Sequence, residues 1–249
     1  MSGLNRTRGF TKSIFKTLWR RSQKERDSIY AKNNRVKESR YKMNLTINPY
    51  ISLNNSKLGD FIPSINLPPV KTCRPDAPCK GLCYARRGNF AFPSVRTSMD
   101  RNLMLYRTNP EWFFGYIKMF LKASGFRHFR WFGAGDIVDE AFFEGMVSVA
   151  KSCRSTRFLC FTKRFEIVND YINKNGALPK NLTVVFSNWG SFICDNPHNL
   201  PTSWVELKTG AEYIPENATR CSGFCGECVN TKASCWRMKA GQSVVFRQH

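Results

Sequence analysis

Four cysteines lie within fifteen residues near the end of the chain, spaced C-x3-C-x2-C-x6-C. They are Cys221, Cys225, Cys228 and Cys235. Thiols two or three residues apart on a turn converge on one metal ion or cluster more readily than they form disulfides, which are strained at such spacings. Gly223 and Gly226 fit this arrangement, because glycine lets the backbone turn tightly and bring amide groups near anionic sulfur. The segment therefore predicts a metal centre.

A second group of cysteines, spaced C-x5-C-x3-C, lies far upstream and comprises Cys73, Cys79 and Cys83. The three other cysteines of the chain are Cys153, Cys160 and Cys194, which we interpret as core residues because a free thiol packs like a small hydrophobic group. No apolar signal segment follows Met1, so we expect a cytoplasmic protein with reduced thiols. Reduced thiols favour metal binding over disulfides.

The spacing of the C-terminal cysteines is compatible with a zinc ion or a [4Fe–4S] cluster. Zinc ribbons pair two short C-x2-C hooks across a long gap, whereas here three thiols share one turn and the fourth follows closely, as in cluster-binding runs. We expect an iron–sulfur cluster, with zinc, or free or bridged thiols, as alternatives. If Cys235 is the fourth ligand, no iron stays open for S-adenosylmethionine, and this set is structural or transfers electrons. The upstream group would then supply an incomplete ligand set or join a C-terminal cysteine in one shared cluster.

The charge of the chain is large and uneven. The net charge is +21 for 249 residues, and residues 1–42 hold 13 Lys and Arg against 3 acidic residues. Apolar residues at helical spacing within this head predict a basic helical extension, which would dock on the body, bind nucleic acid or a membrane surface, or act as a transit peptide. Another polyanion is a further candidate partner of this extension. No apolar run approaches the ~20 residues of a transmembrane helix, so we expect a soluble protein.

Residues 43–249 are expected to form one domain in which strands alternate with helices. Residues 43–70 predict extended chain and turns. The periodicity predicts strands over 129–132, 157–161 and 182–186, further strands near 204–207 and 244–246, and helices over 95–106, 109–124, 140–152 and 165–175. This order predicts an α/β fold with a parallel sheet. The number of units favours a complete or partial (β/α) TIM-like barrel, with an open doubly wound sheet as the alternative.

Polar residues follow three of the expected strands, where ligands bind in either architecture. Asp136 follows the first strand, Lys163 and Arg164 follow the second, and Asn188 follows the third. Taken singly, Asp136 could be a helix N-cap and the two cations solvated loop charges. Together they predict one cofactor-binding mouth, to which Arg130 and His249 would also contribute. The chain shows no Walker loop, HExxH helix or Ser/His/Asp set, so no catalytic residue is assigned.

Five motifs in a fixed order carry a resemblance to a known family. They are Cys79-x3-Cys83-Tyr84-Ala85-Arg86, Phe129-Arg130-Trp131 running into Gly135-Asp136, Phe161-Thr162-Lys163-Arg164, Phe186-Ser187-Asn188-Trp189, and a cysteine-rich end that finishes in Phe246-x2-His249. Over roughly residues 58–249 the chain resembles the phage-encoded iron–sulfur proteins of the gene product 88-like family. The resemblance implies a viral protein that acts in the host cytoplasm. It also implies a TIM-barrel-like body related to the radical S-adenosylmethionine fold and a bound [4Fe–4S] cluster, with no settled activity.

Two hypotheses follow. The first is a viral iron–sulfur protein with one or two clusters near the mouth of the barrel and with redox or radical chemistry. The second is a nucleic-acid-binding protein in which residues 1–42 contact phosphates. Its metal, zinc or iron–sulfur, would only stabilise the C-terminal segment.

Overall fold

The computed structural model describes residues 47–53, 55–59, 61–207 and 213–248. The expected basic helix of residues 1–42 and the expected site residue His249 lie outside these ranges. None of the helices in the described part of the chain is both long and apolar enough to cross a membrane.

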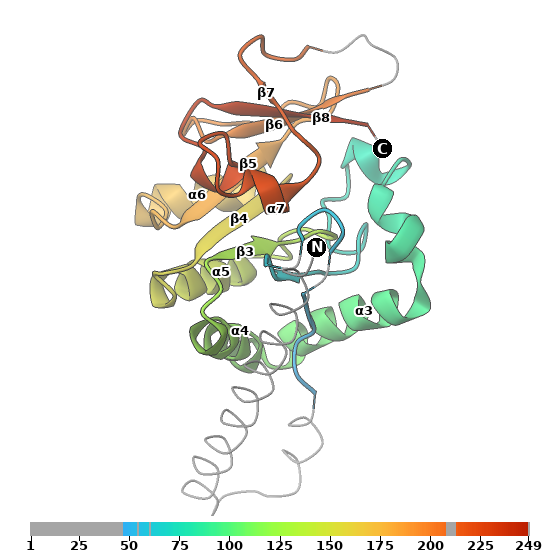
Figure 1. The fold of residues 1–249 in the computed structure, drawn as a ribbon, viewed down its shortest axis with the longest axis vertical. Coiled ribbons are helices and arrows are strands. Elements are labelled where there is room, and N and C mark those ends of the chain that lie inside the picture. The colour runs from blue at the N-terminus through green and yellow to red at the C-terminus, as the bar shows by residue number, and fades with distance from the viewer. Residues whose placement is uncertain (1–46, 54, 60, 208–212, 249) are drawn as a thin grey trace, which may run out of the picture.

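The centre of the fold is an eight-stranded sheet (Figure 1). In spatial order its strands are β1 (Ile51–Ser52), β2 (Ser64–Ile65), β3 (His128–Trp131), β4 (Arg157–Thr162), β5 (Leu182–Ser187), β6 (Thr202–Glu206), β8 (Ser243–Arg247) and β7 (Thr219–Arg220). The β1–β2 pair is antiparallel and every other pair is parallel. The two end strands do not pair with each other, so the sheet is open. The predicted parallel α/β sheet is confirmed, whereas a complete barrel is not found.

Four long helices accompany the sheet, and each was expected from the sequence. They are α3 (Pro93–Thr108), α4 (Pro110–Ser124), α5 (Glu140–Ser152) and α6 (Phe165–Asn175). A single-turn helix, α7 (Cys225–Cys228), and the 3-10 turns η1 (Pro78–Lys80), η2 (Tyr84–Arg86), η3 (Gly88–Ala91) and η4 (Cys235–Arg237) belong to the cysteine segments and their surroundings. These short elements were not predicted, because a single turn carries no periodicity.

The helix starts follow from side-chain caps. Asn109 Oδ1 accepts a hydrogen bond from the backbone N–H of Trp112 at the start of α4, and Asp139 Oδ1 does the same for Phe142 at the start of α5. Such caps satisfy amide groups that have no partner within the helix. The cap of α5 is therefore Asp139, which leaves Asp136 free for another role.

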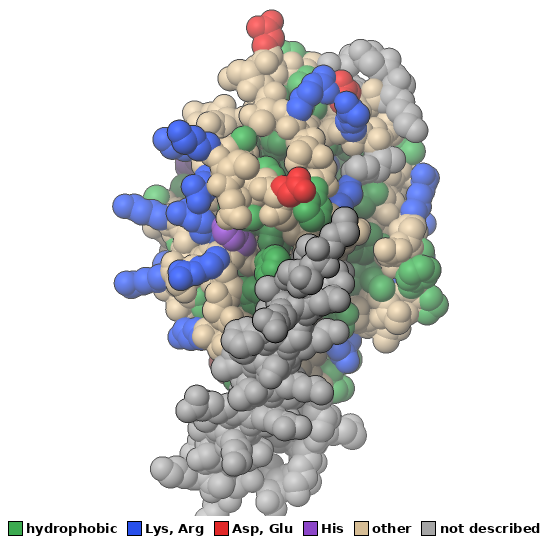
Figure 2. All heavy atoms as spheres, viewed as in Figure 1, with side chains coloured by type: hydrophobic (Ala, Val, Ile, Leu, Met, Phe, Trp, Pro, Cys, Tyr) green, Lys and Arg blue, Asp and Glu red, His purple; other side chains and the backbone are tan. Residues whose placement is uncertain are grey.

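The parallel strands give the sheet two different edges. We call the edge where β3, β4 and β5 begin the amino edge, and the edge where they end the carboxyl edge. In Figure 1, β3 and β4 begin on the left side of the view. Lys and Arg side chains project from the same side in Figure 2, and no Asp or Glu is visible among them. The amino edge is thus basic in this view.

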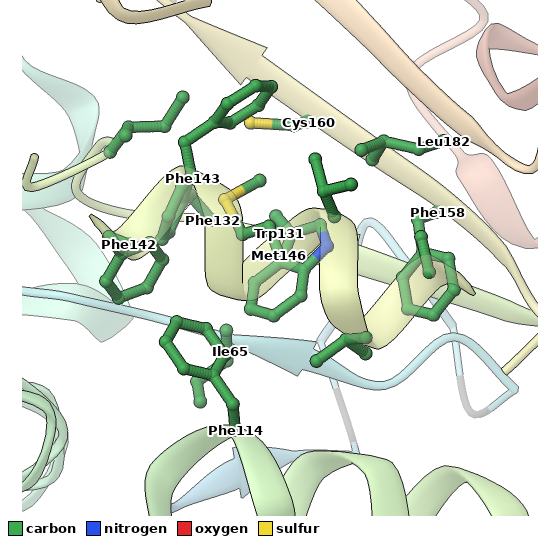
Figure 3. Close-up of a cluster of buried hydrophobic side chains, with 14 of the residues drawn as sticks. Ile65, Phe114, Trp131, Phe132, Phe142, Phe143, Met146, Phe158, Cys160 and Leu182 are labelled. Carbon is green, nitrogen blue, oxygen red and sulfur yellow. The ribbon is translucent and has the colours of Figure 1, made fainter. Parts of the chain in front are cut away.

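One face of the sheet packs against the helices through large aromatic side chains. Trp131 and Phe158 are fully buried; Trp131 packs against Phe114 from α4 and Phe142 from α5, and Phe158 stacks on Trp131 (Figure 3). The two helices approach closely at Gly145, where a Cβ atom would lie 2.2 Å from the Phe114 ring. This well-packed face is a rigid support for the loops at both edges.

The opposite face of the sheet is covered by the C-terminal cysteine segment. Side chains alternate between faces along a strand, so Leu159 and Val185 point away from the helices, and they pack with Val229 and Trp236. Trp236 Nε1 donates to the backbone oxygen of Phe129 at 3.3 Å, and Thr183 Oγ1 donates to the backbone oxygen of Trp236 at 3.1 Å. The cysteines are thereby held against the sheet on the side without helices.

Candidate metal centre

Each of the four C-terminal cysteines is positioned by a short backbone element. The backbone N–H of Cys221, which follows β7, donates to Val245 of β8 at 3.0 Å, and that of Cys225, at the start of α7, donates to the carbonyl of Lys57 at 2.7 Å. Cys228 ends α7, and Cys235 begins η4, whose Trp236 is anchored on the sheet. Two remote parts of the chain, β8 and the loop before β2, therefore hold this segment.

The four thiols lie close enough to influence one another electrostatically. Burial raises the pKa of Cys235 to about 12; Arg130 lowers it, and the anionic forms of the three other cysteines of the group raise it further. The pKa of Cys225 is likewise raised by burial and lowered by Arg130. As thiolates these groups need a compensating cation, which a bound metal centre would supply.

Two basic side chains stand beside this group. Arg130 of β3 places its guanidinium carbon 4.4 Å from the centre of the Phe161 ring, and its Nε donates to the carbonyl of Phe132 at 3.2 Å. Burial lowers the pKa of Lys57, the anionic forms of Cys221 and Cys225 raise it, and Arg130 lowers it. Both cations are therefore within electrostatic reach of the sulfur atoms.

The glycines of the segment have the roles expected from the sequence. The backbone N–H of Gly223 donates to Cys221 Sγ at 3.4 Å, and Gly223 has a φ of +89°, which disfavours other residues. A Cβ atom at Gly226 would lie 2.8 Å from the Phe224 ring. Tight backbone turns thus bring an amide group to a sulfur atom.

The three upstream cysteines form a second set. Burial raises the pKa of Cys73 to about 11, and Asp136, Cys79 and Cys83 raise it further. Burial also raises the pKa of Cys83, which the anionic form of Cys79 raises in addition. The three thiols lie on the short turns around η1 and η2, next to the polar residues that follow β3 and β4.

Asp136 is the centre of a buried polar network at the carboxyl edge. Its carboxylate accepts hydrogen bonds from Thr162 Oγ1 at 2.5 Å and from the backbone N–H groups of Lys163 at 2.9 Å and Ile137 at 2.8 Å. Burial raises the pKa of Asp136, and these three hydrogen bonds oppose that rise. The network ties the end of β3 to the end of β4.

The other expected cofactor-binding residues, Lys163, Arg164 and Asn188, have contacts of their own at this edge. Arg164 donates to the carbonyl oxygens of Thr72 and Val138, and Lys163 Nζ lies 6.0 Å from the centre of the Trp189 ring. Both cations are half-buried, so they are not simply solvated loop charges. Asn188 is buried and accepts a hydrogen bond from the backbone of Cys194 at 2.7 Å.

Tyr84 connects the upstream set to Arg130. Its hydroxyl donates to the carbonyl of Gly133 at 2.6 Å, although the residue as a whole is 47% exposed. Burial of that hydroxyl raises the pKa of Tyr84, Arg130 lowers it, and the anionic upstream cysteines raise it. Arg130 thus acts on Tyr84, next to the upstream set, and on Cys225 and Cys235 of the C-terminal set.

Sequence reasoning missed three residues of this region, namely Lys57, Tyr84 and Arg74. Tyr84 and Arg74 each directly follow a cysteine of the upstream set, a signal that could have found them. Arg74 donates to the backbone oxygen of Lys163 at 3.1 Å and pairs with Glu166 at 3.3 Å. Lys57 has no local sequence signal, since the fold brings it to cysteines far along the chain.

All ten cysteines are free thiols. Cys153 and Cys160 are buried, and Cys194 is partly buried against the main hydrophobic core, as expected for core residues. In the part of the chain that the structure describes, no three Cys, His, Asp or Glu side chains are gathered around a single ion position. The anionic forms of the thiols within each set influence one another's pKa. A [4Fe–4S] cluster binds each thiolate through a different iron atom, so its ligands do not surround one ion position. The donor set, its amide donor and its neighbouring cations fit the chemistry of such a cluster.

Comparison with known proteins assigns the chain to a family. The family model described as gene product 88 matches residues 23–233, which is more than half of the chain, so the chain belongs to this family. The match is consistent with the expected phage-type protein. No curated protein and no solved structure matches the chain.

Proposed function

We propose that this member of the gene product 88 family binds a [4Fe–4S] cluster through Cys221, Cys225, Cys228 and Cys235, and that its chemistry is redox or radical. The observation that supports the proposal is the placement of four free thiols on one segment, within electrostatic reach of one another and of Arg130 and Lys57. When bound, such a cluster would supply one-electron transfer.

The surroundings of the four thiols support a cluster with a net negative charge. Arg130 and Lys57 would stabilise that charge through space, and the Gly223 amide would donate to Cys221 sulfur. Hydrogen bonds and charges near the sulfur atoms tune the stability and potential of iron–sulfur centres. Zinc bound by four thiolates is the alternative occupant.

The upstream cysteines would supply a second, three-ligand set. Cys73, Cys79 and Cys83 would leave one iron without a protein ligand, and S-adenosylmethionine is the candidate for that position. Asp136, Lys163 and Arg164 would then line the cofactor side, with the carboxylate orienting the backbone of Lys163. On this proposal the open sheet is a partial barrel related to the radical S-adenosylmethionine fold.

Serine substitutions test the proposal directly. We expect Cys225→Ser and Cys235→Ser, purified without oxygen, to lose the broad visible absorbance and the iron of the C-terminal cluster. Cys194→Ser, a cysteine outside both sets, is the control and should retain them. Cys79→Ser should lose iron independently if a second cluster is present.

The outcomes separate the alternatives. Unchanged iron and absorbance in both C-terminal variants would refute the proposed ligands. A colourless wild-type protein with one zinc per chain would assign the site to zinc instead. S-adenosylmethionine binding is tested by the change that the cofactor causes in the electron paramagnetic resonance spectrum of the reduced protein, which Cys79→Ser should abolish.

A further inference from the structure

The amino edge of the sheet carries a concentration of exposed basic side chains. Three turns lead into strands there, at residues 125–127, 153–156 and 176–181. Lys151 and Lys174, near the ends of α5 and α6, are exposed at this edge, and Lys174 pairs with Glu140. Six other exposed basic residues lie near these turns or on the adjacent η4, namely Lys122, Arg127, Arg154, Arg157, Lys180 and Arg237. These six come from four separate parts of the chain, and the fold alone brings them to one edge.

No carboxylate is available nearby in the sequence to neutralise these charges. Residues 112–135, 145–165, 171–194 and 228–249 contain no Asp or Glu. Within the described ranges, none of the six basic residues takes part in an ion pair. The Lys and Arg side chains on this side of Figure 2 likewise stand without visible acidic neighbours.

The electrostatic effects at the edge show that these charges act together. Arg157 is the register partner of His128, and its backbone N–H donates to the carbonyl of Arg127 at 2.8 Å. Burial lowers the pKa of His128, and Arg157 and Arg237 lower it further. Two cations from different elements thus reach the same imidazole.

Stabilisation of helix ends does not account for the whole cluster. Basic residues in the last turn of a helix interact favourably with its dipole, which explains Lys122 in α4. Arg127 and Arg157, however, lie at the starts of strands, and Arg237 lies in a 3-10 turn. Stabilisation of a helix end therefore does not account for these three cations.

The character of the edge favours nucleic acid over a membrane. Binding to a membrane surface combines basic residues with apolar side chains that enter the lipid. None of the exposed large apolar residues in the described part of the chain lies in the three turns. An edge with many exposed basic residues and no exposed large apolar side chain in its turns matches a phosphate backbone, which recruits Lys and Arg without apolar insertion.

We propose that the amino edge of the sheet binds the phosphate backbone of a nucleic acid. The site does not include residues 1–42. It lies where β3, β4 and β5 begin, whereas the upstream cysteines lie near the ends of the strands. It needs no bound metal, so its failure and that of the proposed iron–sulfur site are independent.

A matched pair of triple variants of the full chain tests this surface. The first, Arg127→Gln with Arg154→Gln and Arg157→Gln, neutralises the edge. The second, Arg96→Gln with Arg107→Gln and Arg247→Gln, removes the same charge from exposed positions elsewhere. Fluorescence anisotropy would measure binding of labelled duplex DNA and duplex RNA of about 30 base pairs against salt concentration.

The edge variant should bind at least about tenfold more weakly near 100 mM salt, and its slope of log K against log salt should fall by up to about 3. The control should change by less than about threefold, and both should retain the wild-type melting temperature. Equal losses in the two variants, or no loss in either, would overturn the proposal. Loss of binding to phosphatidylserine vesicles with unchanged nucleic-acid binding would assign the edge to a membrane instead.

Discussion

The two edges of the sheet use charge in opposite ways. At the carboxyl edge the basic residues have internal partners, as in the pairs of Arg74 and Arg164 with Glu166 at 3.3 and 3.7 Å and of Arg220 with Glu206 at 2.9 Å. At the amino edge the six exposed cations of the proposed phosphate-binding site have no such partners among the described residues. Basic residues at the carboxyl edge thus take part in ion pairs near the candidate site, whereas those at the amino edge face solvent.

This difference separates the buried polar network around Asp136 from an edge whose cations are exposed. Carboxylates and basic side chains are interleaved at the network, whereas residues 112–135, 145–165, 171–194 and 228–249 contain no Asp or Glu. We therefore expect substitutions within the Asp136 network to affect stability and the proposed cofactor binding, and substitutions of the exposed basic residues at the amino edge to affect neither.

The largest expected effect is that of Asp136→Ala. The change removes one acceptor for three donors, two of them backbone amides, so we expect the free energy of unfolding to fall by about 3 kcal/mol. Urea denaturation followed by circular dichroism would measure it. Asp170→Ala, an exposed carboxylate of α6, is the control and should lie within about 0.5 kcal/mol of the wild type. Similar losses of unfolding free energy in both variants would show that Asp136 stabilises the fold no more than an exposed carboxylate does.

The next effect concerns the two arginines on either side of Phe129. Arg130→Met removes the cation that acts on Cys225 and Cys235, which should lower the reduction potential of a bound cluster by roughly 40 mV, or on the order of 1 kcal/mol. Arg127→Met changes the same charge at the amino edge and should leave the potential unchanged. Redox titration followed by electron paramagnetic resonance measures both. Equal shifts would mean that only the net charge matters.

A smaller effect compares the two ends of α4. Asn109→Ala removes the N-cap and should cost about 1 kcal/mol of the free energy of unfolding. Lys122→Gln, near the other end of the same helix, should cost less than about 0.5 kcal/mol, because an exposed charge interacts only weakly with the helix dipole. Thermal unfolding would show the difference. A larger loss for Lys122→Gln would give the basic amino edge a structural role.

The smallest effect is in the titration of His128. Its pKa is lowered in the folded protein, first by burial and then by Arg157 and Arg237, so the unfolded chain binds the proton more readily. Stability is therefore fully present above the unfolded pKa of about 6.5 and decreases as the pH falls below it. Arg157→Gln should raise the pKa of His128 toward that value, whereas Lys163→Gln at the carboxyl edge should not. Imidazole NMR titration would decide; equal pKa values in the wild type and Arg157→Gln would contradict the account.

The fold was largely predictable where local signals agree. Helices α5 and α6 have the predicted bounds, since their apolar periodicity and the neighbouring strands pointed to the same residues. Closure of the barrel was not predictable. It depends on β1, β2 and β7, which are only two residues long and are set by pairing with remote strands. The N-cap role considered for Asp136 belongs instead to Asp139, three residues further on, which caps α5.

The candidate ligands follow from the sequence and stay a prediction, whereas their surroundings could not be read from it. The cysteine spacings marked both sets, and the backbone of Lys163 after β4 donates to Asp136 after β3, so these expected residues lie close together. Lys57 and the anchoring of Trp236 on Phe129 depend on contacts across more than a hundred residues. No local pattern encodes such contacts.

Iron and acid-labile sulfide analysis of the wild-type protein, purified without oxygen, is the sharpest test of iron–sulfur binding. We expect iron and sulfide in equal amounts, at about four of each per chain for one cluster or about eight for two. Stoichiometric zinc, or the absence of all three elements from folded protein, would contradict it.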